Sequence, residues 1–210
     1  ANPRHPAQLG FLICHADDVI VCHRIGDVLR RFASQIKGRA IHGKHRFYPV
    51  KIGAAIGEIL KLDDFFQTGT GHRRGFARKV MLLGRSRGGL MTLSWAAENA
   101  DKVAGFAGIY PVCNLASYPG LTNAAPAFGL KPAELRAELS RHNPVDRLES
   151  LARARVPLFV IHGDQDRLVP LEANSGLVRS RYQALKGPFE WVVPAGQGHS
   201  MWTGFFQSPE

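Results

Sequence analysis

The chain has 210 residues, of which 45% are hydrophobic and 21% charged, values close to the averages of globular proteins. A chain of this length and composition is neither largely disordered nor long enough for two large domains, so we expect a single domain over residues 1–210. Its three cysteines are an odd number without zinc-type spacing, which argues against a disulfide framework.

The net charge of +10 is concentrated in the first 80 residues, which hold 14 Lys or Arg against 6 Asp or Glu and so carry +8. Such a surface attracts acidic partners, but no basic motif interleaved with aromatic residues accompanies it, so we expect no nucleic-acid partner. No apolar run approaches the roughly 20 residues that span a bilayer, and residues 1–10 lack the layout of a secretory signal. We therefore expect a soluble chain without a membrane contact, while the compartment and the oligomeric state are not predicted.

In chain order, the first 75 residues follow no regular alternation of elements. Residues 11–23 fit one strand, or two strands around an Asp-Asp turn, and two amphipathic patterns predict helices over 25–36 and 50–66. The glycine-rich residues 67–75 predict a loop. Four histidines of this segment lack the carboxylate or cysteine spacing of a metal site: His15, His23, His42 and His45. We predict no metal and no cofactor.

From residue 79 onward, short apolar runs alternate with helical patterns. The apolar runs predict strands over 79–84, 101–112, 157–163 and 189–194. The intervening patterns predict helices over 88–100, 131–142 and 171–187. Strands separated by helices of this length are typical of a mostly parallel sheet with helices on both faces, so the predicted fold class is α/β. Trp95 continues a helical pattern with Leu90, Met91 and Leu93 nearby, of which Met91 is four residues before it, and we expect Trp95 in the core.

The junction between the strand over 79–84 and the following helix reads Gly84-Arg85-Ser86-Arg87-Gly88, which matches the nucleophile elbow G-x-S-x-G. In that motif a tight turn from strand to helix lifts the serine hydroxyl above the sheet, and the glycines leave space that a Cβ would fill. The match alone is a weak signal, and the strand before it and the helix after it strengthen it. Ser86 is therefore the candidate nucleophile.

A serine hydroxyl needs a base that takes its proton, and that base needs a carboxylate that holds its tautomer. Three histidines follow the candidate nucleophile. We expect His142, beside an Asn-Pro break, and His162, at a strand end, to be structural. His199 stands in a loop of small residues from which the ring can reach the serine, and it is the candidate base.

Two carboxylates between the serine and His199 compete for the third role, Asp164 and Asp166, and the resulting order of serine, acid and histidine is that of α/β-hydrolases. Residues 162–170, His-Gly-Asp-Gln-Asp-Arg-Leu-Val-Pro, resemble the acid loop His-Gly-x-x-Asp-x-x-Val-Pro of the dienelactone-hydrolase and prolyl-oligopeptidase-like branch of that superfamily. The resemblance places the acid on Asp166 and leaves Asp164 at a variable position. It covers residues 75–202, and the Ser-Arg-Gly-Gly elbow is similar to that of bacterial esterases acting on carbohydrate or small acyl esters.

The resemblance implies an α/β-hydrolase fold with an oxyanion hole made of two backbone N–H groups. One belongs to the residue after the nucleophile, Arg87. The other comes from a loop after an earlier strand, for which His23 or Arg24 is the candidate. The first third of the chain is atypical for the family, because residues 1–75 lack its His-Gly-Gly loop and its rhythm of strands and helices.

Residues 114–143 fall where the family places a small cap over the pocket, and Tyr118 within them is a candidate for substrate binding. Trp202 is a second candidate, close to the base in sequence and suited to stacking on a sugar. Arg85 and Arg87 flank the nucleophile, where a guanidinium suits a substrate carboxylate. The alternative for these two arginines is a set of salt bridges to neighbouring loops.

The sequence thus predicts a serine esterase that forms an acyl-enzyme on Ser86 and takes a small-molecule or carbohydrate ester as its substrate. A small peptidase is the alternative within the class. We expect it less, because family peptidases carry a large gating domain for which 210 residues leave no room. The alternative outside the class is a non-catalytic relative that binds a ligand or protein partner through the same pocket.

Overall fold

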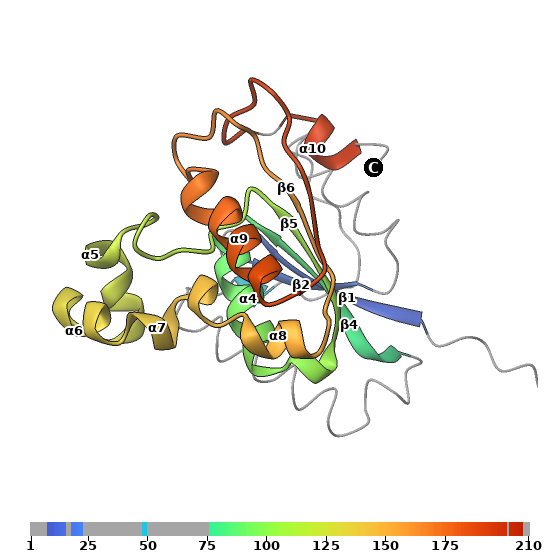
Figure 1. Ribbon diagram of the computed structural model, residues 1–210, viewed down its shortest axis with the longest axis horizontal. Coiled ribbons are helices and arrows are strands. Elements are labelled where there is room, and N and C mark those ends of the chain that lie inside the picture. The colour runs from blue at the N-terminus through green and yellow to red at the C-terminus, as the bar shows by residue number, and fades with distance from the viewer. Residues whose placement is uncertain (1–7, 16–17, 23–47, 50–75, 201, 208–210) are drawn as a thin grey trace, which may run out of the picture.

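The structure is a computed structural model, and it describes residues 8–15, 18–22, 48–49, 76–200 and 202–207 (Figure 1). Several predictions of the sequence analysis lie outside these residues: the helices over 25–36 and 50–66, the loop over 67–75, and His23, Arg24, His42 and His45. Within the described residues, no helix has the length and apolar character needed to cross a membrane.

Seven strands of the described residues form one sheet in the order β3-β2-β1-β4-β5-β6-β7. They are β1 Gln8–His15, β2 Asp18–Cys22, β3 Tyr48–Pro49, β4 Phe76–Arg85, β5 Val103–Ile109, β6 Leu158–Ile161 and β7 Phe189–Val192. Five neighbouring strands, β1, β4, β5, β6 and β7, pair in parallel. At one edge of the sheet, β2 runs antiparallel to β1 and β3 runs antiparallel to β2. The mostly parallel sheet confirms the predicted α/β class, and the pairing of His15 with Asp18 confirms two strands rather than one in residues 11–23.

The helices of the described residues are α4 Arg87–Glu98, α5 Leu121–Ala124, α6 Pro132–Ala137, α7 Leu139–His142, α8 Glu149–Arg153, α9 Leu177–Ala184 and α10 Gly204–Gln207. Shorter turns are η1 Ala100–Lys102, η2 Ala125–Phe128, η3 Pro144–Asp146 and the π turn η4 Glu172–Gly176. Figure 1 shows α4, α8 and α9 along the same face of the sheet. They connect parallel strands, which a tight hairpin cannot do.

The main core lies between this helical layer and the sheet. Its buried cluster includes Leu82 of β4, Phe106 of β5 and Val160 of β6, together with Leu93 and Trp95 of α4. Each such side chain contributes about 1.5–3 kcal/mol when it is fully removed from water. Trp95 is 4% exposed, which confirms the expectation that it is a core residue.

Neighbouring strand residues point to the opposite face of the sheet, because side chains alternate along a strand. Leu83 of β4, Ile161 of β6 and Val192 of β7 belong to a second cluster there, which also contains Phe205 of α10. The described helices therefore contact both faces of the sheet, as predicted for the fold.

Residues 113–143, between β5 and η3, fold as a small helical insert to one side of the sheet (Figure 1). The insert encloses a buried cluster that includes Leu115 and Leu135 and extends to Leu90 of α4 and Val169 after β6. The helix predicted over 131–142 is divided, since α6 ends at Ala137 and α7 begins at Leu139. The region predicted as a cap thus rests on α4 and on the loop after β6.

The helix predicted over 171–187 begins with the π turn η4 and becomes α9 only at Leu177. Within the turn, the N–H of Gly176 donates to the C=O of Leu171 at 2.9 Å, the wider spacing of a π helix. The turn carries two buried polar residues, Asn174 and Ser175, whose side chains bond to segments distant in sequence. The periodicity of the sequence does not show these tertiary contacts. They occur at the turn where the chain is not a regular α-helix.

Candidate active site

Ser86 lies in the turn between β4 and α4, and its backbone has the left-handed φ of 51° that a nucleophile elbow requires. The N–H of Ser86 donates to the C=O of Ile109 at 3.1 Å, and its own C=O accepts from Val112 at 2.8 Å. A Cβ on Gly84 would lie 2.8 Å from the Cα of Gly89, closer than real Cβ contacts come. The glycine is required because the start of α4 packs directly on the end of β4.

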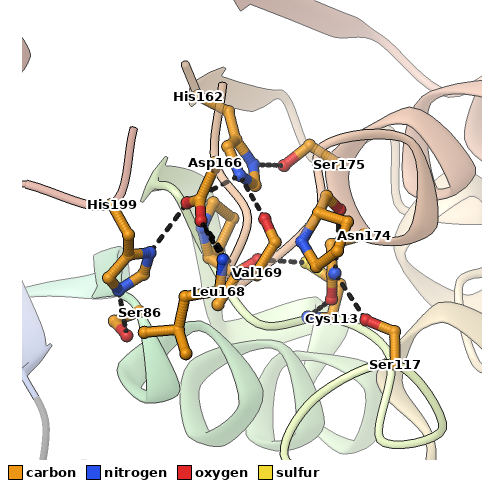
Figure 2. A network of polar contacts seen from close by, with 12 residues as sticks. Ser86, Cys113, Ser117, His162, Asp166, Leu168, Val169, Asn174, Ser175 and His199 are labelled. Carbon is orange, nitrogen blue, oxygen red and sulfur yellow. Dashed lines mark hydrogen bonds and ion pairs between the residues drawn. The ribbon is translucent and has the colours of Figure 1, made fainter. Parts of the chain in front are cut away.

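The candidate base and acid reach the serine from the ends of β7 and β6. His199 places its Nε2 2.9 Å from the Oγ of Ser86 and its Nδ1 2.7 Å from the Oδ2 of Asp166 (Figure 2). The structure therefore brings together the three residues that the sequence motifs single out, in the geometry of a proton relay. Asp164 is exposed and takes no part in it, since its Oδ1 accepts the N–H of Gly196 at 2.7 Å.

Asp166 is 5% exposed, and four donors surround its carboxylate. The backbone N–H groups of Leu168 and Val169 donate to Oδ1 at 3.0 and 2.8 Å, while His199 at 2.7 Å and His162 at 3.3 Å face Oδ2. Burial alone would raise the pKa of this carboxyl, but the hydrogen bonds from the two histidines and from Val169 outweigh burial and hold the pKa well below its usual range. The acid is ionised at neutral pH. Sequence reasoning treated His162 as structural and missed its contact with the acid.

The imidazole of His199 also rests on an aromatic ring that the sequence analysis did not single out. The ring of Tyr110 lies 4.3 Å from the imidazole between centroids, and Tyr110 is fully buried with a left-handed φ of 36°. Burial raises the pKa of the Tyr110 hydroxyl, although the neighbouring Arg85 acts in the opposite direction. Its place just after β5, in the sequence Ile-Tyr-Pro, is the one signal that could have pointed to it.

Trp202 lies at the end of a row of rings that starts at His199. Phe205 contacts Tyr110 edge to face at 5.0 Å, and Trp202 contacts Phe205 in the same way at 5.3 Å. Trp202 is 41% exposed. The predicted substrate residue is therefore linked to the imidazole through two intervening rings and offers a solvent-facing aromatic surface.

Of the two arginines that flank the serine, Arg85 turns to Tyr110, with its guanidinium carbon 5.5 Å from the centre of that ring. The Nε of Arg85 is buried and has no hydrogen-bond partner among the described residues. Arg85 also makes no ion pair with any of the described residues. Arg87 is the first residue of α4, so its backbone N–H lies at the helix N-terminus beside Ser86.

Tyr118 packs against the buried cluster of the insert. The second oxyanion candidates, His23 and Arg24, lie outside the described residues. His142 belongs to the insert as well, where its ring lies 4.9 Å from that of Phe128. In the described part of the chain, no group of three or more His, Cys, Asp or Glu side chains is arranged to hold a metal ion.

Comparison with known proteins places most of this chain in one family. The profile of the prolyl oligopeptidase family (Peptidase_S9) matches residues 73–208, which include all three residues of the relay. The acylamino-acid-releasing enzyme of Arabidopsis thaliana is 27% identical over 111 residues, which are 49% of this chain and 14% of that protein.

Solved structures share the fold. The acylaminoacyl peptidase of Pyrococcus horikoshii superposes with a TM-score of 0.55 at 20% identity and covers 71% of this chain and 24% of its own. A puromycin-hydrolyzing peptidase of Mycobacterium tuberculosis also reaches a TM-score of 0.55, at 19% identity, over 72% of this chain and 23% of its own. The chain thus spans less than a quarter of the length of each of these relatives.

Proposed function

The chain belongs to the prolyl oligopeptidase family, and we propose that it acts as a serine hydrolase through an acyl-enzyme on Ser86. The observation that carries this proposal is the relay of two short contacts, 2.9 Å from Ser86 to His199 and 2.7 Å from His199 to Asp166. A hydroxyl at this distance from an imidazole nitrogen can give up its proton as it attacks a carbonyl carbon.

In the first half of the reaction, the Oγ of Ser86 bonds to the carbonyl carbon and its proton passes to the Nε2 of His199. The imidazolium that forms is stabilised by the ionised Asp166, which accepts from Nδ1. The imidazolium then protonates the leaving group as the tetrahedral intermediate collapses. In the second half, water loses a proton to His199 as its oxygen bonds to the acyl carbon. The bond from that carbon to the Oγ of Ser86 then breaks, the imidazolium returns the proton to Oγ, and the acid leaves.

The negative charge that develops on the carbonyl oxygen needs N–H donors nearby. We assign one of them to the backbone of Arg87, because this residue starts α4 directly after Ser86. The positive end of the helix dipole favours an anion at the same place. A donor of this kind is worth about 2.7–4 kcal/mol in the transition state.

For the bond that is cleaved, we propose the amide bond of a peptide or acylated amino acid, with carboxylic esters as more reactive alternatives. The family and the solved relatives are named as peptidases and the Arabidopsis relative as an acylamino-acid-releasing enzyme, which supports the amide. The length of 210 residues does not count against a peptidase, because this sequence spans only part of those proteins. The exposed ring of Trp202 is a surface on which a substrate side chain can pack.

The test compares hydrolysis by the wild type and by Ser86→Ala, with Ser94→Ala of the same helix as the matched control. One arm uses p-nitrophenyl esters from acetate to octanoate, and the other uses N-acetylated amino-acid p-nitroanilides. We expect a burst and steady turnover for the wild type and the control, and a loss of at least about 10³-fold for Ser86→Ala.

Turnover of the anilides supports a peptidase, while turnover of the esters alone assigns the protein to the carboxylic ester hydrolases. If the folded wild type cleaves neither substrate, the proposal of a hydrolase is wrong and a non-catalytic binding role takes its place.

A further inference from the structure

The acid of the relay is shared by two histidines. The Oδ2 of Asp166 lies 2.7 Å from the Nδ1 of His199 and 3.3 Å from the Nε2 of His162 (Figure 2). His162 comes from the end of β6, and its side chain is 0% exposed. An imidazole that is fully buried next to the acid of the relay, on the side away from the serine, suggests a part in holding that acid.

The contacts of His162 fix where its protons are. Its Nε2 also lies 2.9 Å from the C=O of Val169, and both a carbonyl and a carboxylate are acceptors only. Nε2 must therefore carry a hydrogen. Its Nδ1 lies 2.7 Å from the Oγ of Ser175, which is fully buried in the π turn η4.

With a neutral His162, each of these groups has a hydrogen-bond partner of the right kind. Ser175 donates its hydroxyl proton to Nδ1, and the ring keeps the hydrogen on Nε2 for its two acceptors. A cationic ring would place a second positive charge beside Asp166 at the moment when His199 becomes an imidazolium. In a buried site that repulsion opposes the reaction. The titratable side chains that face Asp166 within the described residues are His162, His199 and Tyr110.

We propose that His162 and Ser175 are positioning residues of the relay: the Ser175 hydroxyl fixes the Nε2–H tautomer of His162, whose N–H holds Oδ2 of Asp166 toward His199. The inference rests on the proposed function, since it gives Asp166 the role of the acid. It extends the relay from three residues to five, in the order Ser86, His199, Asp166, His162 and Ser175 (Figure 2).

The π turn explains why Ser175 stays in place. The preceding residue, Asn174, is also fully buried, and its Oδ1 accepts the backbone N–H groups of Cys113 at 3.0 Å and Asn114 at 3.1 Å. Its Nδ2 donates to the Oγ of Ser117 at 2.8 Å. Asn174 therefore fixes the π turn to the start of the insert, while Ser175 of the same turn contacts His162. The same turn thus contacts both the insert and the histidine that faces Asp166.

The first test is kinetic and uses Ser175→Ala, which leaves the His162 ring intact. Ser180→Ala on α9 is the matched control, because its hydroxyl bonds only locally to the C=O of Leu177 and is exposed. For Ser175→Ala we expect kcat to fall by about 5- to 10-fold, the effect of one neutral hydrogen bond, with KM unchanged within about twofold. Equal kcat in the two variants overturns the role of Ser175.

The second test compares His162→Gln with His162→Leu. A glutamine can present an N–H near the position of Nε2, whereas leucine removes the donor and keeps the bulk. We expect the glutamine variant to retain at least about fivefold more kcat than the leucine variant at similar thermal stability. If activity instead follows the melting temperature in both variants, His162 is a structural residue only.

The third test does not need turnover. Long-range ¹H–¹⁵N spectra of the folded protein report the tautomer of each histidine, and the His162 signals are those that disappear in His162→Gln. We expect a neutral Nε2–H ring in the wild type and an altered signature in Ser175→Ala but not in Ser180→Ala. A charged ring or the Nδ1–H tautomer in the wild type contradicts the inference. A wild type that shows no turnover but has this signature refutes the proposed hydrolase function and leaves the hydrogen-bonded pair itself established.

Discussion

The two loops that supply the partners of Ser86 hold them in different ways. In the acid loop, residues 162–170, the side chain of Asp166 is 0% exposed and takes three of its four donors, His162, Leu168 and Val169, from its own loop. In the base loop, residues 193–200, the side chain of His199 is 15% exposed, and within the described part of the chain it contacts Asp166, Ser86 and the ring of Tyr110, all from outside that loop.

The base loop is also positioned by the acid loop through its backbone. The N–H of Gln165 donates to the C=O of Gln197 at 2.9 Å, and the carboxylate of Asp164 accepts the N–H of Gly196 at 2.7 Å. The acid is therefore oriented by nearby sequence, whereas the base depends on the acid loop for its place. Changes that displace the backbone of the acid loop or remove its buried carboxylate should disable both partners, and changes confined to the base loop should be milder.

The largest effect is expected for Asp166→Asn. The amide nitrogen would meet N–H donors on every side of the site and could no longer hold the Nδ1–H tautomer of His199. We expect kcat to fall by about 10⁴-fold, measured on the most reactive ester that the wild type cleaves. Asp164→Asn is the control in the same loop. A loss smaller than about tenfold would assign the acid to another residue.

Gly163→Ala breaks the contact between the loops without touching either functional side chain. A Cβ at this position would lie 2.6 Å from the carbonyl carbon of Gln197, two residues before His199. The base loop must then move away, and we expect kcat to fall by about 10²-fold together with a lower melting temperature.

Gly198→Ala is the matched variant in the base loop, since a Cβ there would lie at an ordinary 3.4 Å from the carbonyl oxygen of Gln165. We expect it to keep kcat within a few-fold of the wild type. If the two alanine variants lose activity equally, the asymmetry between the loops is wrong.

Tyr110→Leu tests whether the ring of Tyr110 helps to position the imidazole of His199. The leucine removes the ring against which the imidazole lies, and we expect about a tenfold loss in kcat with Asp166 and Ser86 still in place. Tyr110→Phe keeps the ring and should retain most of the activity. Single-turnover kinetics with an ester measure the acylation step directly, and equal rates for the two variants would show that the ring has no part in placing His199.

The smallest effect is expected for Asp164→Ala, which removes one exposed hydrogen bond between the loops. A twofold to threefold decrease in kcat at nearly unchanged melting temperature is the expected result. Asp101→Ala, at an exposed position before β5, serves as the control. No difference between these two variants would mean that backbone contacts alone hold the base loop.

The elements from β4 onward were predictable because their signals are local. The strand before Ser86 and the helix after it, the spacing of the acid loop and the small residues around His199 are all readable within about ten residues of each site. The exclusion of Asp164 also followed from a pattern of this length, and the structure gives that residue a different task.

The residues that sequence reasoning missed act across longer distances. Tyr110 reaches His199 from the end of a different strand, and His162 contacts Ser175, which lies in a π turn where the pattern predicts an α-helix. Contacts of this kind depend on tertiary packing, which no local periodicity encodes. The predicted second oxyanion donor, His23 or Arg24, lies outside the described residues.

Labelling with a fluorophosphonate probe, followed by intact mass and peptide mapping, shows whether Ser86 is the nucleophile. We expect one added phosphonyl group on Ser86 in the wild type, none in Ser86→Ala and much slower labelling in Asp166→Asn. Labelling of Ser86→Ala at the wild-type rate, or of a different residue in the folded wild type, would contradict the assignment of Ser86 as the nucleophile.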